Sequence, residues 1–200
     1  MKYFIVGLHA SGKQEVVDML EKLNVKCGKL FSDVENASNE LYNSYNYELY
    51  TQSDVNDVFE NNAYIFMHEL QTDPEIFHAY RIYEGLSKYE FDQNDVFVLS
   101  PDQVVSIPQN AINEDICFIW MDNTKHNRVS RYHSEKRQYN FNNRDEVERR
   151  DIDTFVKTIY SFNNAPVLYF TNEEPCRVAT IIYTLIQHPE LLNLYSQHFN

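Results

Sequence analysis

The sequence predicts an α/β fold in which a central parallel sheet is covered by helices on both faces. Two observations predict it. Short, continuous apolar runs alternate along the chain with helix-compatible stretches, which is typical of parallel strands buried on both faces. The first of these runs also leads directly into a Gly-containing loop and then into a helical pattern. The 200 residues, of which 43% are hydrophobic, are enough for one such domain with a small insertion.

The elements are expected in the following order. Residues 3–6 form the first strand, and a helix begins at Lys13, because apolar residues then recur at helical spacing. Further strands are expected at residues 25–31, 95–99, 116–121 and 167–170. Helices are expected at residues 53–60, with Ser53 or Asp54 as the cap, within the basic stretch 123–162, and at 176–186. The acidic segment 32–76 otherwise shows only weak periodicity.

Composition limits the classes of function. The net charge of −13 disfavours binding to nucleic acid, because affinity for a phosphate backbone comes mainly from Lys and Arg. No run reaches the roughly 18 apolar residues of a membrane span, and no signal peptide fits the N-terminus, so we expect a cytoplasmic protein without membrane contact. Cys27, Cys117 and Cys176 are single and far apart, which fits neither a disulfide framework nor a zinc site.

Charge is unevenly distributed along the chain. No Lys or Arg occurs between Lys29 and Arg81, where acidic residues are frequent, whereas close to half of the 17 Lys and Arg fall between residues 125 and 150. This basic stretch is either a solvated helical face with its own acids or a lid that closes on an anion. We favour the lid, because no other part of the chain has enough guanidinium groups to neutralise a transferring phosphoryl group.

The stretch GLHASGKQ at residues 7–14 fits the P-loop pattern of a Gly, four free positions and Gly-Lys. Its place between a strand and a helix favours a nucleotide site over a Gly-rich turn with an exposed Lys. In a P-loop the backbone N–H groups and the helix N-terminus point at the triphosphate, and the Lys reaches its β and γ oxygens. ATP is the expected cofactor, bound by Gly7, His9, Ala10, Ser11, Gly12, Lys13 and Gln14. His9 is expected to face solvent and not to carry protons.

Gln14 departs from the P-loop pattern, which has Ser or Thr at this position. The Ser or Thr hydroxyl ligates Mg²⁺ directly, whereas a Gln amide is longer and neutral. Mg²⁺, the second expected cofactor, would then be held by an amide oxygen, by water or by another residue. Nucleotide binding should therefore tolerate Gln14 better than catalysis does.

With these segments placed in order, most of the chain resembles the guanylate kinase family of nucleoside monophosphate kinases. The resemblance is carried by GLHASGK, by YEGLSKYEFDQNDVFVL with SPDQ, by FIWMDNTKHNRVSRYHSEKRQYNFNNRDEVERRD and by VLYFTNEE. It implies a P-loop NTPase three-layer fold with a small lobe for the acceptor nucleotide and a helical lid. By this comparison residues 1–31, 92–122 and 151–200 form the core, 32–91 the acceptor lobe and 123–150 the lid.

The resemblance also implies roles for single residues. Tyr83 and Ser87 would face the acceptor monophosphate, Asp102 would lie near the metal and the acceptor, and Asn172 would lie near the ATP base. Gln14 and Asp102 would hold the metal. The catalytic set would consist of Lys13, Asp102 and the lid arginines Arg131, Arg137, Arg149 and Arg150.

Several family features are missing at the acceptor site. The family grips the acceptor phosphate with arginines of a Thr-Thr-Arg segment, and this chain has KLFSDVENAS there, without Arg. Tyr47 is the closest counterpart of a phosphate-binding Tyr of the family, although it is equally read as a half-buried aromatic. Arg81 is a candidate to replace the charge of the missing arginines. The guanine-reading Glu, expected near residues 64–66, is replaced by an apolar residue. Plain GMP is therefore not the expected acceptor.

The function expected from these features is ATP-dependent phosphoryl transfer to a nucleoside or deoxynucleoside monophosphate, a small-molecule substrate. The alternative is a kinase-derived binding module that has lost catalysis and binds a protein partner through the acidic segment 32–76; Gln14 and the missing arginines favour it, and fold alone does not establish activity. A kinase acting on a base in DNA is disfavoured by the net charge. The sequence leaves a homodimer open.

Overall fold

The central sheet is parallel and has the order β6-β1-β7-β8. The computed structural model describes residues 1–33, 47–71, 81–108, 110–112, 115–134, 141–150, 152–159, 161–162, 165–171 and 173–196. The four strands are β1 (Lys2–Val6), β6 (Val96–Leu99), β7 (Ile116–Asp122) and β8 (Val167–Thr171). β1, β6 and β7 are nearly continuous apolar runs because both of their faces are buried, whereas Tyr169 and Thr171 of the edge strand β8 are exposed. The predicted strands at 3–6, 95–99, 116–121 and 167–170 are confirmed.

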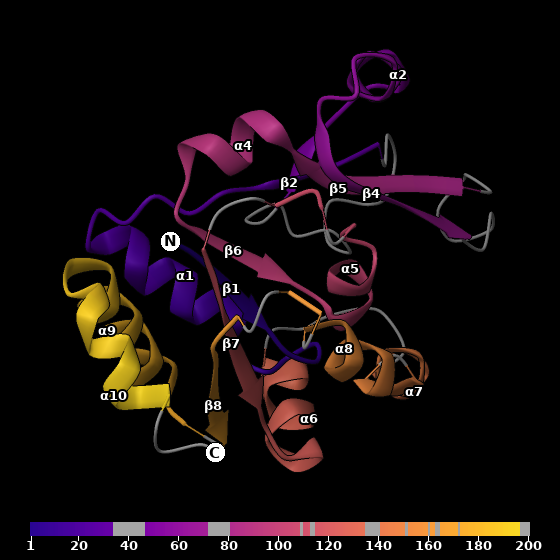
Figure 1. The fold of residues 1–200 in the computed structure, drawn as a ribbon. Coiled ribbons are helices and arrows are strands. Elements are labelled where there is room, and N and C mark those ends of the chain that lie inside the picture. The colour runs from indigo at the N-terminus through magenta and orange to yellow at the C-terminus, as the bar shows by residue number, and fades with distance from the viewer. Residues whose placement is uncertain are drawn as a thin grey trace.

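Helices cover both faces of this sheet (Figure 1). On one face Ile5 and Ile119 pack with α1 (Lys13–Lys22) and α9 (Pro175–Gln187), beside the short helices η1 (Pro189–Leu191) and α10 (Leu192–Ser196). On the other face Phe4 and Phe118 pack with α4 (Lys88–Gln93), α5 (Pro101–Val105) and α8 (Ile152–Ile159). Alternate residues of β1 thus enter opposite cores, and the predicted three-layer α/β fold is confirmed.

A second sheet, of order β3-β2-β5-β4, lies beside the first (Figure 1). Its strands are β2 (Leu30–Ser32), β3 (Tyr47–Leu49), β4 (Tyr64–Gln71) and β5 (Arg81–Ser87). β5 pairs antiparallel with β2 and β4, whereas β2 and β3 are parallel. The sequence indicated neither β4 nor β5. The strand predicted at 25–31 is reduced to β2, preceded by a single bridge from Cys27 to Val96.

The helix predicted at 53–60 is α2 (Gln52–Glu60), but its predicted cap is wrong. Thr51 is the N-cap residue: its hydroxyl accepts from the backbone N–H of Asp54, and the Asp54 carboxylate accepts from the backbone N–H of Thr51. This reciprocal pair satisfies two donors at once, which a helix starting at Ser53 would not achieve.

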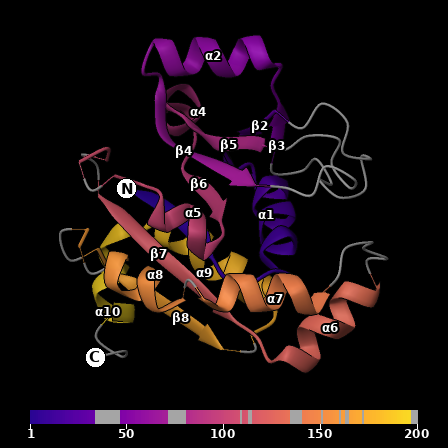
Figure 2. The same ribbon diagram turned by 90° about the vertical axis from the view of Figure 1, so that its right-hand side faces the viewer.

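The basic stretch 123–162 contains α6 (Lys125–Ser134), α7 (Phe141–Arg150) and α8, as its helix-compatible composition predicts. Figure 2 shows α6 and α7 side by side at one end of the central sheet. In the ranges described above, no helix is both long and apolar enough to cross a membrane. The three cysteines are free thiols.

Candidate phosphate-binding site

The GLHASGKQ loop connects β1, an inner strand of the central sheet, to α1. Both of its glycines are required by geometry. A Cβ added at Gly7 would lie 2.5 Å from the carbonyl oxygen of Met121 in β7, and Gly12 has a φ of +98°, which L side chains rarely adopt. Ala10 also lies in the left-handed region, with φ +54°, so the backbone of this loop is tightly turned.

Gly12 is the N-cap residue of α1, so the helix start has no capping side chain. The first N–H groups of an α-helix have no acceptor within the helix, and the helix dipole places partial positive charge at the same end. A helix start with these properties is suited to binding the oxygens of a phosphate group.

Lys13 lies at this helix start with its ammonium group folded onto the loop. Its Nζ donates to the carbonyl oxygens of Gly7 and Leu8, the latter at 2.9 Å. The only side-chain cation within the motif is thus held at the loop, where an incoming anion could exchange for the two carbonyl oxygens. That Lys13 binds phosphate stays a prediction.

Arg131 of α6 reaches the same loop from the other side. Its Nη1 donates to the Ser11 carbonyl at 3.5 Å, and its Nε is 3.1 Å from a carboxylate oxygen of Glu15. The guanidinium carbon lies 3.3 Å from a Cβ position built on Gly12. The sequence predicted that Arg131 approaches the phosphates, and the structure places its guanidinium group against the loop.

Asn123, directly after β7, fixes the loop backbone. Its Nδ2 donates to the Ser11 carbonyl at 2.7 Å, and its side chain is buried. The sequence analysis did not single out Asn123. A signal was present, because a polar residue that follows a buried strand next to the P-loop strand lies at the ligand-binding edge of a parallel sheet.

The guanidinium group of Arg128 is buried and paired, so it is not available to bind phosphate. Its side chain is 0% exposed and its Nη2 donates to Asp145 of α7, while Nη1 and Nε approach the carbonyls of His9 and Asn123 at 3.4 Å. Arg149 also binds Asp145, at 3.1 Å. Counting Arg128 as part of an anion-binding reservoir was therefore wrong: it joins α6, α7 and the loop.

Asp145 is a buried carboxylate shared by several cations. Besides Arg128 and Arg149, Lys125 lies 3.6 Å away. Burial by itself raises the pKa of Asp145, but the hydrogen bonds and charges of Arg128 and Arg149 outweigh it, so the net pKa lies below the ordinary value. The carboxylate stays charged and holds α6 to α7.

His9 is buried, so the expectation that it faces solvent was wrong. Its side chain is 4% exposed, and its ring packs edge-on against Phe141 of α7 with centroids 4.5 Å apart. Its backbone carbonyl faces Arg128. The third residue of the loop is therefore fixed from α6 and α7, which a single sequence window does not reveal.

Gln14 and Asp102, the predicted metal ligands, take part in separate sets of contacts. Gln14 Nε2 donates to Asp18 Oδ1 one turn along α1, at 2.8 Å. Asp102, in the first turn of α5, has Oδ2 3.7 Å from Nδ1 of His68. Gln14 makes this contact through its amide nitrogen, whereas its Oε1 is the atom that could ligate Mg²⁺. The metal assignment stays a prediction.

The predicted acceptor residues lie in the second sheet. The Tyr47 hydroxyl accepts from Gln103 Nε2 at 2.9 Å, and the Tyr83 hydroxyl is 3.3 Å from Glu69. The Ser87 hydroxyl caps α4 by accepting from the N–H of Glu90, so its observed role is structural. Tyr47, Tyr83 and Ser87 thus hydrogen-bond to three different partners, and their role at an acceptor stays a prediction.

The remaining predicted residues lie wholly or partly outside the described part of the chain. Arg137 and Asn172 are outside it. Arg81 begins β5 and Arg150 ends α7, but their side chains are outside it as well. Arg149, predicted at the phosphates, is described and binds Asp145.

The fold is similar to solved kinase structures, although no protein-family model and no curated protein matches the sequence. Guanylate kinase from Anaplasma phagocytophilum has a TM-score of 0.53 and 9% identity, with 93% of this chain and 84% of that chain covered. Shikimate kinase from Aquifex aeolicus has 16% identity, with 96% of this chain and 99% of that chain covered. Its TM-score of 0.35 is too low to support an argument.

The likeness to guanylate kinase confirms the predicted fold, a P-loop kinase-like arrangement of a parallel sheet with helices on both sides. At 9% identity it establishes the fold alone.

Proposed function

We propose that this protein transfers the γ-phosphoryl group of ATP to a nucleoside or deoxynucleoside monophosphate. One observation carries the proposal: at the uncapped start of α1, Lys13 of the loop and Arg131 of α6 both contact the loop backbone. A helix start with two cations beside it suits a polyanion better than any neutral ligand. The kinase-like fold supports this reading.

In the proposed reaction the N–H groups of the loop and of α1 bind the donor phosphates. Lys13 would leave the carbonyls of Gly7 and Leu8 for phosphate oxygens, and Arg131 would exchange Glu15 for them. Phosphoryl transfer between polyanions needs positioning and charge neutralisation more than covalent help. Mg²⁺ bound with ATP would neutralise charge between its phosphates.

We place the acceptor in the lobe at residues 32–91, closed by the lid at residues 123–150. Tyr47, Tyr83, Ser87 and Arg81 are the candidate acceptor ligands, and Asn172 the candidate neighbour of the ATP base. The lack of Arg in KLFSDVENAS and of the guanine-reading Glu argues against plain GMP. A nucleotide with another base, including a modified pyrimidine, is the proposed acceptor.

The donor site is tested by calorimetric titration of ATP with Mg²⁺ into the parent and Lys13→Ala. Loss of one charge-assisted contact should weaken binding by about 2 kcal/mol, about 30-fold. Lys22→Ala is the matched control, because Lys22 is an exposed cation at the other end of the same helix. Equal ATP affinity for all three proteins, or no binding by the parent, would remove the nucleotide site.

Transfer is tested with an ATP-coupled assay over ribo- and deoxyribonucleoside monophosphates, including 5-substituted pyrimidines. At least one should turn over at about 1–100 s⁻¹. Arg131→Ala should lower that rate by about 10²–10³-fold, the scale of a lost charge-stabilising donor. Arg177→Ala, which removes an exposed Arg paired with Glu173, should not. If ATP binds and no acceptor reacts, the protein is the binding module and not an enzyme.

A further inference from the structure

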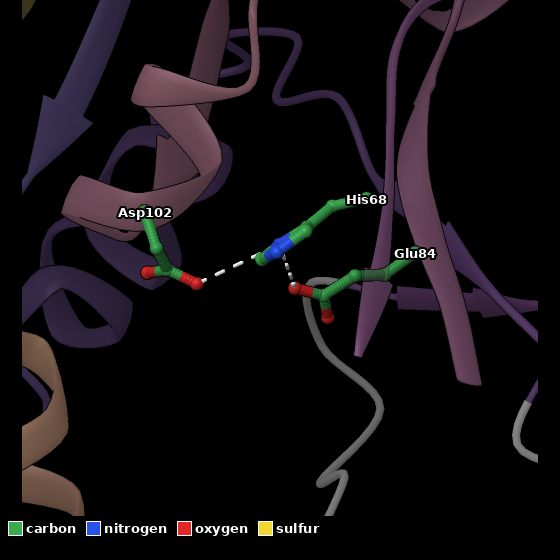
Figure 3. A group of neighbouring side chains, drawn as sticks. All are labelled: His68, Glu84 and Asp102. Carbon is green, nitrogen blue, oxygen red and sulfur yellow. Dashed lines mark ion pairs between the residues drawn. The ribbon is translucent and has the colours of Figure 1, made fainter. Parts of the chain in front are cut away.

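Three metal-ligating side chains converge where the second sheet meets α5. Figure 3 shows His68 of β4 and Glu84 of β5 extending from neighbouring strands toward Asp102 of α5. One ligand atom from each lies within 4.8 Å of the others. The three residues are far apart in sequence and belong to two layers of the fold.

The separations suit a small divalent cation between the three groups. His68 Nδ1 is 3.7 Å from Asp102 Oδ2 and 4.0 Å from Glu84 Oε1. Both distances are too long for hydrogen bonds. Ligands bound at about 2.1 Å to a tetrahedral ion lie about 3.4 Å from one another, so the three groups would move closer together when the ion binds.

The site combines a buried carboxylate with an imidazole nitrogen that lacks a hydrogen-bond partner among the described residues. Glu84 is 4% exposed, and Gln103 donates to its Oε1 at 2.7 Å through a neutral amide. Nδ1 of His68 is a buried atom with no hydrogen-bond partner in the described structure, although it faces two carboxylates. A metal ion bound by both carboxylates would also give the imidazole nitrogen a partner.

Ser32 provides an independent indication of a ligand at this point. It pairs with Glu84 across β2 and β5, and Glu84 pairs with His68 across β5 and β4. Side chains of directly paired residues share one face of a sheet, so the three form a row. Ser32 is 0% exposed, and its hydroxyl has no hydrogen-bond partner in the described structure. A hydroxyl so placed can hydrogen-bond a metal-bound water.

We propose that His68, Glu84 and Asp102 bind one divalent transition-metal cation such as Zn²⁺ or Mn²⁺, with water as a further ligand. An imidazole with two carboxylates favours such ions over Mg²⁺ or Ca²⁺, which prefer oxygen ligands alone. The ion ties β4 and β5 to α5, so it fixes the second sheet against the central one. Asp102 then does not hold the Mg²⁺ that accompanies ATP, so the two ions are distinct, and the proposal holds whether or not the protein is a kinase.

The test is calorimetric titration of the chelator-treated full chain with Zn²⁺, and separately with Mn²⁺ and Mg²⁺, without nucleotide. We expect one Zn²⁺ per chain, with Mg²⁺ much weaker. His68→Ala, Asp102→Asn and Glu84→Gln should each weaken Zn²⁺ binding by more than about 100-fold, because changes in outer-sphere partners alone already cost 10–100-fold. Glu84→Gln keeps an acceptor for Gln103, so folding should survive.

The matched control is His188→Ala. His188 pairs with Glu190 at 3.3 Å on an exposed surface, so it is a His–carboxylate contact of the same kind without the third ligand. This variant should bind Zn²⁺ like the parent. Circular dichroism of every variant checks that it is folded, and the Co²⁺-loaded parent should show a visible absorption band that His68→Ala lacks.

Two results would overturn the proposal. One is a parent that binds no Zn²⁺ stoichiometrically. The other is equal binding by the parent, His68→Ala and Asp102→Asn, which would place the ion elsewhere. In either case His68, Glu84 and Asp102 do not hold a metal ion together. The kinase assay is independent of this titration, so failure of one does not imply failure of the other.

Discussion

Replacing Asp145 by Asn should lower the free energy of unfolding by about 3–5 kcal/mol, the cost of leaving a buried charge without its partner. Arg128 is 0% exposed, and Asp145 is the carboxylate that its Nη2 contacts. The other acceptors of Arg128 are carbonyls at 3.4 Å, near the limit of a hydrogen bond. These carbonyls are neutral, so they cannot replace the lost carboxylate.

Urea unfolding followed by circular dichroism measures this change. With a slope of about 1–3 kcal/mol per M, the midpoint should fall by about 1–5 M. Asp153→Asn is the control, because Asp153 is an exposed acid in the first turn of α8, and its loss should cost less than about 0.5 kcal/mol. A double variant, Arg128→Met with Asp145→Leu, should be more stable than Asp145→Asn, since it removes both buried charges.

The pH dependence follows from the lowered pKa of Asp145. A carboxyl group with a lower pKa in the folded than in the unfolded protein contributes stability above its unfolded pKa and loses it as pH falls through the folded pKa. The difference between parent and Asp145→Asn should be constant near neutral pH and shrink below about pH 4. A loss under 1 kcal/mol at pH 7, or a difference that grows on acidification, would refute the assigned role of Asp145.

Two further predictions concern the loop. Gly7→Ala should lower the free energy of unfolding by about 1–3 kcal/mol and abolish ATP binding, because its Cβ would lie 2.5 Å from the Met121 carbonyl oxygen. Thermal unfolding and ATP calorimetry measure both effects, with Ser53→Ala on exposed α2 as the control. An unchanged melting temperature would contradict the prediction. Gln14→Ser should raise Mg²⁺-dependent ATP affinity, because it places a short hydroxyl at the helix start while losing only the contact to Asp18. Titrations with and without Mg²⁺ measure this, and a fall in both would mean that Gln14 has a role of its own.

The features that could be predicted from the sequence depend on residues close together in the chain. GLHASGK and the apolar run before it predict strand, loop and helix, which are β1, the P-loop and α1. β6 and β7 were recognisable because burial on both faces makes a strand apolar throughout, and β8 because VLYF is a short apolar run, although one of its faces is partly exposed. Lys13 could be assigned to the loop because the GxxxxGK pattern lies between a predicted strand and a predicted helix.

The second sheet could not be predicted in the same way. β4 reads YIFMHELQ and β5 reads RIYEGLS, so each mixes apolar residues with acids, His or Arg. Part of that polarity is buried against α5, where Glu84 meets Gln103 and His68. Alternation of apolar and polar residues, the usual signal of such a strand, is therefore lost.

The sequence alone determined where the loop between the first strand and the first helix lies, because such a loop is a local backbone conformation set by its own glycines and the helix after it. Tertiary structure alone decided which charged side chains are available to a ligand. Arg128 is buried because Asp145 lies 17 residues away on another helix, whereas Arg131, one turn later, reaches the loop. His68, Glu84 and Asp102 meet only after two strands pair and α5 packs beside them. The free energy of a charge depends on its burial and its partners, and both are set by contacts between residues distant in sequence.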